Sequence, residues 1–374
     1  MYGRLYTNYQ TVIDDVDTFA VKRDSSILSR GGEVVVPSSG ETAEDIARAS
    51  VVLNPNIIIG GDLNVLRPDE SLDSTFLALT ISNGNQQKEL AKRAQGKSVV
   101  HLYSSDLAKV NLKKPGIAEQ AKISALFRSL DEIIALQKRK TEALRLLKNA
   151  LIQHIFPLLG HDTPRIRFAG YSSPWPKYKF GEITKPISSN TLSRADLNYS
   201  RGEIMNIHYG DILVKFGSVL DVRREQLPYI INQTADKYQN QILENGDIIF
   251  ADAAEDATVG KATEVAGIAD HSIVAGLHTI AARPTRPVQP YYLGYYLNSP
   301  QFRNGILPLL QGIKVLSLSR ANLNKAELKI PETNTEQMKI GSILHAHDEL
   351  IAQAVSRADQ LTGLKAALLR EVFM

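Results

Sequence analysis

Two long stretches of the chain place apolar residues at every third or fourth position, and each predicts a long helix. The first, residues 118–156, contains no Pro or Gly, and the second, residues 334–372, contains no Pro. At about 1.5 Å per residue, each helix would be roughly 50 Å long. The apolar stripe is narrow, so each helix needs a partner, and the other helix is the obvious one. We expect this helix seam to contain Leu130, Ile133, Leu144, Leu147, Leu151, Leu350, Leu361, Leu364 and Leu368.

Short β-rich runs precede each of these stretches. "EVVVP" (33–37) and "NIIIGGDLNVL" (56–66) come before the first, and "GDIIFAD" (246–252) and "HTIAAR" (278–283) come before the second. Turn residues separate the runs, and each set is followed by one helical segment ("STFLALTISN" or "PYYLGYYLNS"). This order predicts α+β domains built from short strands.

The chain contains the same unit twice. Residues 95–115 and 311–331 are identical at nine of 21 positions, with a constant shift of 216. "NVLRP" (64–68) matches "IAARP" (280–284) at that shift, and "EQAKI" (119–123) matches "EQMKI" (336–340) at a shift of 217. A period this long indicates a duplicated domain rather than a solenoid. We interpret the repeated stretch as the joint between each domain and its helix, with apolar residues packed on the core.

The repeat divides the chain into four parts. We expect a first α+β domain at residues 1–115, a first helix at 116–157, a second α+β domain at 158–331 and a second helix at 332–374.

Composition excludes several classes of protein. The chain is 43% hydrophobic and 22% charged, which is typical of a globular protein, and it has no apolar run of 18 residues. We therefore expect no membrane segment, no secretory signal and a cytoplasmic location. The absence of cysteine excludes disulfides, thiolate catalysis and cysteine zinc sites. A net charge of +3 is too small by itself to imply a polyanionic partner.

No catalytic motif is present. The sequence lacks phosphate-binding, dinucleotide-binding, nucleophile-elbow and HExxH patterns, and it lacks the Asn/Asp-Pro-Pro-Tyr/Phe motif of base methylation. His345 and His347 are two positions apart, so on a helix they point to different sides and cannot bind one metal ion. The sequence predicts a chain that binds rather than reacts.

Residues 161–224 have a net charge of +4, with ten Lys and Arg against six acids, which exceeds the +3 of the whole chain. Aromatic and small polar residues lie between them, as a surface that positions phosphates and reads base edges requires. A solvated, loop-rich surface explains the same composition. Two weaker candidates also have structural explanations. The tyrosines at 291, 292, 295 and 296 could stack on bases or pack inward, and the basic run 137–148 could contact phosphate or simply face solvent.

An ordered set of motifs resembles the specificity subunit of type I restriction–modification systems. Trp175 followed by "KFGEI" (179–183) begins a unit, "GDI" begins strands, "QGIKVLSLSRANLNKAELKIP" (311–331) closes a unit, and "EQMKI" (336–340) starts a helix that continues through "HDELI" (347–351). "PSSGETAEDIA" (37–47) and "GGDLNVLRP" (60–68) resemble the family's target-recognition domains. The resemblance covers essentially the whole chain.

This resemblance implies how the protein works. Each α+β domain would recognise one half of a split double-stranded DNA target, and the two helices would pair as an antiparallel coiled coil that sets the separation of the halves. Methyltransferase (modification) subunits would dock around the helices and use S-adenosylmethionine. Translocase/nuclease (restriction) subunits would use ATP and Mg. The chain itself would bind no cofactor and catalyse no reaction. The DNA contacts that we expect are Lys177, Lys179, Arg194, Lys215, Arg223 and Arg224.

The sequence departs from the family pattern at one place. About 45 residues, from Arg165, precede Tyr209 in the second unit, whereas Tyr2, its counterpart, has almost nothing before it. We expect the first recognition domain to be truncated at its N-terminus, and either impaired or completed by another chain. A product of gene rearrangement that functions mainly through its second unit is the alternative.

Two other classes of function remain open. One is a non-catalytic coiled-coil scaffold that assembles proteins without DNA specificity. The other is an enzyme, which would need a cofactor or metal site that we do not find in the sequence.

Overall fold

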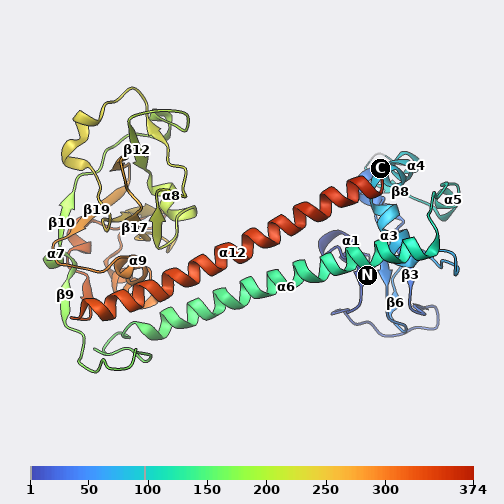
Figure 1. Ribbon diagram of the computed structural model, residues 1–374, viewed down its shortest axis with the longest axis horizontal. Helices are drawn as coiled ribbons and strands as arrows, with labels where there is room; N and C mark the ends of the chain where they lie inside the picture. Colours follow the sequence, from blue (N-terminus) through green and yellow to red (C-terminus); the bar gives the residue numbers. More distant parts are fainter. Residues whose placement is uncertain (1, 97) are drawn as a thin grey trace. The chain divides into compact units, whose positions relative to one another are not determined.

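The computed structural model describes residues 2–96 and 98–374 (Figure 1). Met1, which begins the first expected domain, and Lys97, in the first copy of the repeat, lie outside the described residues. The chain divides into two compact units, one comprising Met1–Thr141 with Gln353–Met374 and the other comprising Glu142–Ala352. The two long helices, α6 (Ile117–Ile155) and α12 (Asn334–Val372), each contribute to both units.

The first unit is built on a four-stranded sheet in the order β1-β5-β3-β7. β1 and β5 are parallel and the other neighbours are antiparallel. Val34 and Val36 on β3 are fully buried, and α3 and α4 complete their core. The elements are α1 (Arg4–Thr7), β1 (Val12–Ile13), β2 (Ile27–Leu28), β3 (Glu33–Pro37), β4 (Ser39–Gly40), α2 (Ala43–Ile46), β5 (Ser50–Val52), β6 (Ile58–Ile59), β7 (Leu63–Leu66), α3 (Ser74–Ser82), α4 (Gly84–Arg93), β8 (Val100–His101) and α5 (Ser104–Leu107).

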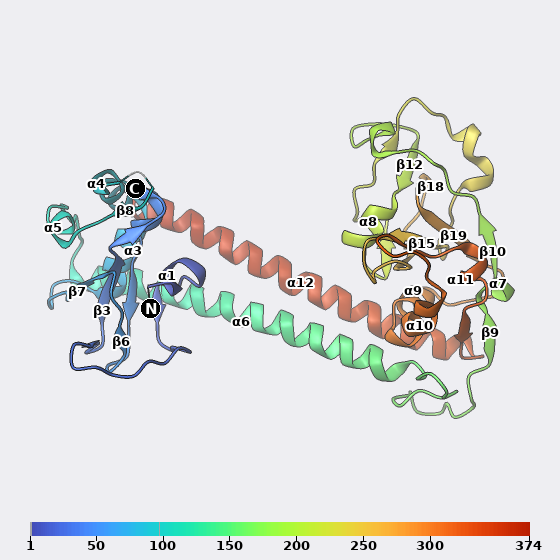
Figure 2. The same ribbon diagram turned by 180° about the vertical axis from the view of Figure 1, so that it is seen from behind.

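The second unit contains a five-stranded sheet in the order β10-β19-β15-β17-β13 and a four-stranded sheet in the order β11-β14-β12-β18. Figure 2 labels β10, β19 and β15 of the first of these sheets and β12 and β18 of the other. Its elements up to β15 are β9 (Lys177–Lys179), α7 (Phe180–Ile183), β10 (Thr184–Ile187), η1 (Arg194–Asp196), β11 (Leu197–Asn198), β12 (Ile204–Ile207), α8 (Tyr209–Val214), β13 (Val219–Asp221), β14 (Tyr229–Ile230), η2 (Ala235–Gln241) and β15 (Ile248–Ala251). The others are β16 (Ala253–Ala254), β17 (Ala262–Ala266), β18 (Ser272–Ala275), β19 (Thr279–Pro284), α9 (Tyr292–Leu297), α10 (Pro300–Ile306), η3 (Leu307–Leu309), β20 (Leu316–Ser317), α11 (Arg320–Leu323) and β21 (Glu327–Lys329).

The duplication is visible strand by strand. β13-β17-β15-β19 repeats the order, the directions and the register of β1-β5-β3-β7, so that Val12 opposite Val51 in the first unit corresponds to Val219 opposite Glu264 in the second. β10 has no counterpart in the first sheet as described. Each α+β domain is followed by one of the two long helices. The predicted architecture is confirmed.

The repeated stretch forms the same tight loop twice. The backbones of Gln95 and His101 exchange two hydrogen bonds, as do those of Gln311 and Ser317. Gly96 and Gly312 have φ angles of 129° and 111°, and a Cβ atom at either would lie 2.0 Å from a carbonyl oxygen, so only glycine fits. Leu318 is buried as expected, whereas Val315 at the tip of the loop is 54% exposed.

The two long helices pack together. In the first unit Phe127 of α6 lies against Phe373, which directly follows α12, and Asp131 of α6 pairs with Lys365 of α12, so the helices run antiparallel there. In the second unit Lys148 of α6 pairs with Asp348 of α12. Among the described helices, none has the length and hydropathy needed to cross a membrane.

Of the nine expected seam positions, five are at least partly buried. Leu130, Leu361 and Leu368 belong to one apolar cluster with Phe127 and Phe373, Leu151 packs on the core of the second unit, and Leu144 is half-buried. The other four are exposed, namely Ile133 (41%), Leu147 (50%), Leu350 (45%) and Leu364 (49%). The buried stripe of α6 runs instead through positions such as Ile134 and Thr141. It also accepts the half-buried Lys148, because Asp348 pairs with that amine.

Candidate functional site

The six basic residues expected to contact DNA lie in three separate places in the second unit. Lys177 and Lys179 are on β9, next to β21. Arg194 lies in η1 and pairs with Asp211 of α8 at 2.7 Å. Lys215, Arg223 and Arg224 come together around the turn that follows β13, where Lys215 donates to the carbonyl oxygen of Gln226 at 2.8 Å. The structure therefore does not gather the six into one patch.

Carboxylates within the chain already hold several of these cations. Arg223 donates two hydrogen bonds to Asp221, at 2.9 and 2.7 Å, and Arg224 pairs with Glu349 of α12. Hydrogen bonding to these carboxylates raises the pKa of both arginines, and hydrogen bonding to Arg223 lowers the pKa of Asp221. Lys177 pairs with Asp162 at 3.3 Å. Lys179 keeps an exposed side chain on β9, so its ammonium group can reach a phosphate without breaking such a pair.

Four further polar residues, which sequence reasoning missed, form a cluster with Arg194. We call Arg194, His208, Tyr209, Asp252 and His278 the histidine cluster. The rings of His208 and Tyr209 have centroids 4.6 Å apart, and Tyr209 meets His278 edge-on at 5.2 Å. His278 Nδ1 lies 3.2 Å from a carboxylate oxygen of Asp252.

The cluster presents varied hydrogen-bonding chemistry at one place. Burial, and then the nearby Arg194, lowers the pKa of His208, which favours its neutral imidazole. Burial also raises the pKa of the Asp252 carboxyl. Guanidinium, imidazole, phenol and carboxyl groups together can donate to and accept from base edges. One feature of the sequence could have pointed to these residues, namely a polar residue directly beside a strand. His208 follows β12, Asp252 follows β15, and His278 precedes β19.

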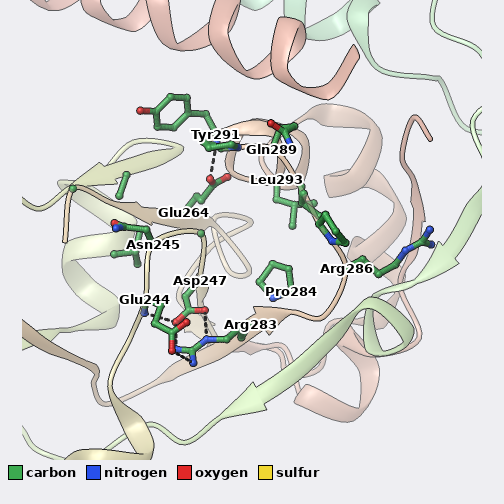
Figure 3. Close-up of a pocket in the computed structure, with 17 residues that line it drawn as sticks. Glu244, Asn245, Asp247, Glu264, Arg283, Pro284, Arg286, Gln289, Tyr291 and Leu293 are labelled. Carbon is green, nitrogen blue, oxygen red and sulfur yellow. Dashed lines mark hydrogen bonds and ion pairs between the residues drawn. The ribbon is translucent and has the colours of Figure 1, made fainter. Parts of the chain in front are cut away.

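A cavity of about 460 Å³ opens between the ends of β15, β17 and β19 and the proline-rich segment before α9 (Figure 3). Glu264 lies in its wall and accepts hydrogen bonds from the backbone N–H groups of Tyr291 (2.5 Å) and Gly294 (2.9 Å). Burial raises the pKa of Glu264 to about 7. Arg283, also in the wall of the cavity, forms ion pairs with Asp247 and Glu244. Glu264 therefore fixes the backbone at the start of α9, and Arg283 holds the turn before β15, so both have structural roles.

The tyrosines before and in α9 are part of the core. Tyr292, Tyr295 and Tyr296 are at most 4% exposed, so they pack inward and do not form a base-stacking platform. Tyr291 stacks on His345 of α12 with ring centroids 4.1 Å apart. Among the described residues, no group of three or more His, Asp or Glu side chains is placed to bind a metal ion.

The comparisons with known proteins agree on one family. The family model described as "Type I restriction modification DNA specificity domain" matches residues 4–146 and 173–361. The fold is similar to the crystal structure of a type I restriction–modification S subunit from M. genitalium, with a TM-score of 0.56, 15% identity, and coverage of 97% of this chain and 88% of the other. A second similar structure is described as the "structural basis underlying complex assembly and conformational transition of the type I R-M system". Its TM-score is 0.51 and its sequence identity is 16%, with coverage of 94% of this chain and 84% of the other. No curated protein matches. The chain therefore belongs to the family of type I restriction–modification DNA specificity (S) subunits, and it is a non-catalytic specificity subunit with two target-recognition domains.

Proposed function

We propose that this S subunit recognises a bipartite double-stranded DNA target and docks methyltransferase (modification) and translocase/nuclease (restriction) subunits. The observation that carries the proposal is the internal symmetry of the helix contacts. Lys148 of α6 pairs with Asp348 of α12, and the corresponding pair, Lys365 with Asp131, has the two helices exchanged. Reciprocal contacts of this kind are those of a two-fold dimer, and two-fold readers recognise two half-sites.

Residues that differ between the two domains are the best candidates to read sequence. In the second domain we propose that the histidine cluster reads base edges through Arg194, Asp252 and His278, because these side chains are partly exposed and include both donors and an acceptor. His208 is buried and contacts the ring of Tyr209. We propose that Lys177, Lys179, Lys215, Arg223 and Arg224 contact phosphates, and that Arg194 contacts DNA as part of the histidine cluster. Lys179 is the strongest of these, since its ammonium group is exposed, whereas Arg223 and Arg224 are already paired with carboxylates.

The exposed apolar residues of the long helices support the docking of partner subunits. Ile133 and Leu350 occupy the same position in the two copies of the helix, and so do Leu147 and Leu364. All four are between 41% and 50% exposed. Apolar side chains repeated on the surface of both helices favour two equivalent protein contacts. Two methyltransferase subunits, one for each half-site, would fit this arrangement.

The remaining assignments follow from this role. Residues 1–115 and 158–331 would be the recognition domains, and residues 116–157 and 332–374 the spacer helices. S-adenosylmethionine would bind to the methyltransferase subunits, and ATP and Mg to the translocase/nuclease subunits, with no cofactor on this chain. The complex would act in the cytoplasm, where its DNA substrate lies.

Salt-dependent DNA binding tests the proposal against the scaffold alternative. We expect the chain, assembled with its methyltransferase subunits, to bind DNA with an affinity that falls steeply with salt and that retains a preference for one sequence at high salt. A complex that assembles but binds all DNA sequences equally, or binds none, would favour a scaffold without DNA specificity.

A further inference from the structure

Asp62 and His278 occupy the same position in the two recognition domains. Asp62 directly precedes β7 and His278 directly precedes β19, the matching strand of the second unit (Figure 2). Both residues have a left-handed backbone conformation, with φ angles of 57° and 53°. This conformation is unfavourable for every residue except glycine, so both copies of the domain carry strain at the same place.

Glycine is used at another matched pair of positions with positive φ. Gly96 and Gly312 have φ angles of 129° and 111°, and both copies keep glycine there. At the position of Asp62 and His278 neither copy does so, although glycine would relieve the strain. Strain that both copies retain points to a function for the side chains that cause it.

The same backbone hydrogen bond holds both strained residues. Ser38 directly follows β3, and its N–H donates to the carbonyl oxygen of Asp62 at 2.9 Å. Asp252 directly follows β15, and its N–H donates to the carbonyl oxygen of His278 at 3.0 Å. Each strained residue is therefore tied to the end of the neighbouring strand in the same way.

Ser38 and Asp252 are themselves anchored by matching bonds to the core. Their carbonyl oxygens accept from the backbone N–H groups of Leu102 (3.0 Å) and Leu318 (2.8 Å). These leucines are 0% and 1% exposed. The two domains thus present two polar side chains from one and the same rigid backbone arrangement.

The side chains on this shared arrangement differ between the domains. Ser38 and Asp62 in the first domain correspond to Asp252 and His278 in the second, and both Asp62 and His278 are exposed. Two identical partner subunits would meet the same residue in both domains, whereas two half-sites of different sequence need different ones. The difference therefore favours DNA as the contact of this position.

We propose that Asp62 reads a base edge in the half-site of the first domain, at the position that His278 holds for the other half-site. The inference rests on the proposed function and gives the first domain a sequence-reading residue. A carboxylate accepts hydrogen bonds and repels phosphate. Asp62 would therefore accept from an amino group in the major groove, either N4 of cytosine or N6 of adenine. The Ser38 hydroxyl, beside it, can donate or accept.

Selection of bound DNA from a random library, by the chain assembled with its methyltransferase subunits, tests the proposal. We expect the parent chain to specify cytosine or adenine at one position of one block. Asp62→Asn and Asp62→Gly should each reduce that preference at least tenfold, and His278→Ala should leave that position unchanged. Asp62→Asn should also bind non-cognate DNA more tightly, because it removes a negative charge that faces the DNA.

Melting curves separate a reading role from a structural one. Glycine relieves the strain, so Asp62→Gly should melt at least as high as the parent chain while it loses discrimination. Asn56→Gly is the matched control, since Asn56 has a φ angle of 65° in the turn between β5 and β6. It should keep the parent's melting temperature or raise it and recover the same DNA sequences as the parent.

Three results would overturn the proposal while the proposed function stands. The first is a parent chain that specifies two blocks which Asp62→Asn and Asp62→Gly leave unchanged. The second is a lower melting temperature for Asp62→Gly with both blocks relaxed alike, and the third is an equal loss of preference in Asn56→Gly. A parent chain that enriches no sequence would overturn the proposed function, and this inference with it.

Discussion

Lys148 of α6 and Asp348 of α12 form an ion pair, and Tyr295 of α9 contacts both of these residues. The Tyr295 hydroxyl donates to Asp348 at 2.6 Å, and the Lys148 ammonium group lies 5.1 Å from the centre of the Tyr295 ring. The second copy of this pair, Lys365 with Asp131, lacks the aromatic partner, because Leu79 occupies the position of Tyr295. The two copies are therefore a natural comparison between an ion pair with and without a supporting aromatic residue.

We expect Lys148→Ala to lower the free energy of unfolding by about 2 kcal/mol, since it removes a charge-assisted hydrogen bond and a cation–π contact. Lys365→Ala should cost about 1 kcal/mol, since it breaks an equally buried ion pair that has no cation–π contact. Urea denaturation of both variants measures the difference. Equal losses, or a larger loss for Lys365→Ala, would contradict the role assigned to Tyr295.

The exposed leucines of the long helices should matter for assembly and not for folding. We expect Leu147→Asp or Leu364→Asp to leave the melting temperature nearly unchanged and to remove one of two bound methyltransferase subunits, because each leucine belongs to one of the two equivalent surfaces. The double variant should bind none. Sedimentation or native mass spectrometry of the reconstituted complex gives the stoichiometry.

Leu146→Asp is the matched control for this experiment. Leu146 is 62% exposed, but its counterpart is Gly363, so it is not part of the repeated pair. An assembly defect as large for Leu146→Asp as for Leu147→Asp would show that exposure alone, and not the repeated surface, causes the effect.

Lys179 and His278 should affect DNA binding in different ways. We expect Lys179→Ala to weaken binding to all sequences alike and to reduce the slope of log affinity against log salt by about 0.9, the value for one lost phosphate contact. His278→Ala should reduce the preference for the cognate half-site and leave the salt slope unchanged. Titrations at four salt concentrations, with cognate and scrambled DNA, separate the two. A changed salt slope for His278→Ala would assign that side chain to the phosphate backbone instead.

The buried Glu264 should make stability depend on pH. Its pKa is raised to about 7 in the folded chain, whereas the ordinary carboxyl pKa of 4.5 applies in the unfolded chain. Between these two pH values the folded state therefore keeps a proton that the unfolded state has lost. This contribution is fully present below about pH 4.5 and is lost as the pH rises through 7. A shift of this size corresponds to about 3 kcal/mol.

Glu264→Gln removes the titrating group while keeping the shape of the side chain. We expect the difference in unfolding free energy between the parent chain and the variant to change in favour of the variant between pH 5 and pH 8. Urea denaturation across that range gives the difference. A constant difference would mean that the carboxyl group keeps an ordinary pKa in the folded chain.

The repeat made the architecture predictable, but it did not make the helix seam fully predictable. Two matching copies placed the domains and the helices, because the matched motifs follow one another in the same order in both copies, at a shift of 216 before each long helix and 217 within it. The seam was assigned from apolar residues alone, which favoured Leu147 over its neighbour Lys148. A lysine is half-buried there because Asp348, 200 residues away, provides its partner.

The candidate DNA contacts were harder to predict for the same reason. Arg223 and Arg224 look alike in the sequence, and both pair with carboxylates, but Arg224 reaches Glu349 at a separation of 125 residues. The histidine cluster joins residues from η1, the end of β12 and the turns beside β15 and β19. No local pattern encodes such a grouping, although each of its histidines lies at the end of a strand.

The central claim is that one chain reads two half-sites at a fixed separation. Selection of bound DNA from a random library by the reconstituted methyltransferase complex tests it most directly. The account predicts a recovered sequence with two short specified blocks separated by an unspecified gap of constant length, and it predicts that His278→Ala relaxes only one of the blocks. A single continuous block, two blocks at variable spacing, or no enriched sequence would contradict it.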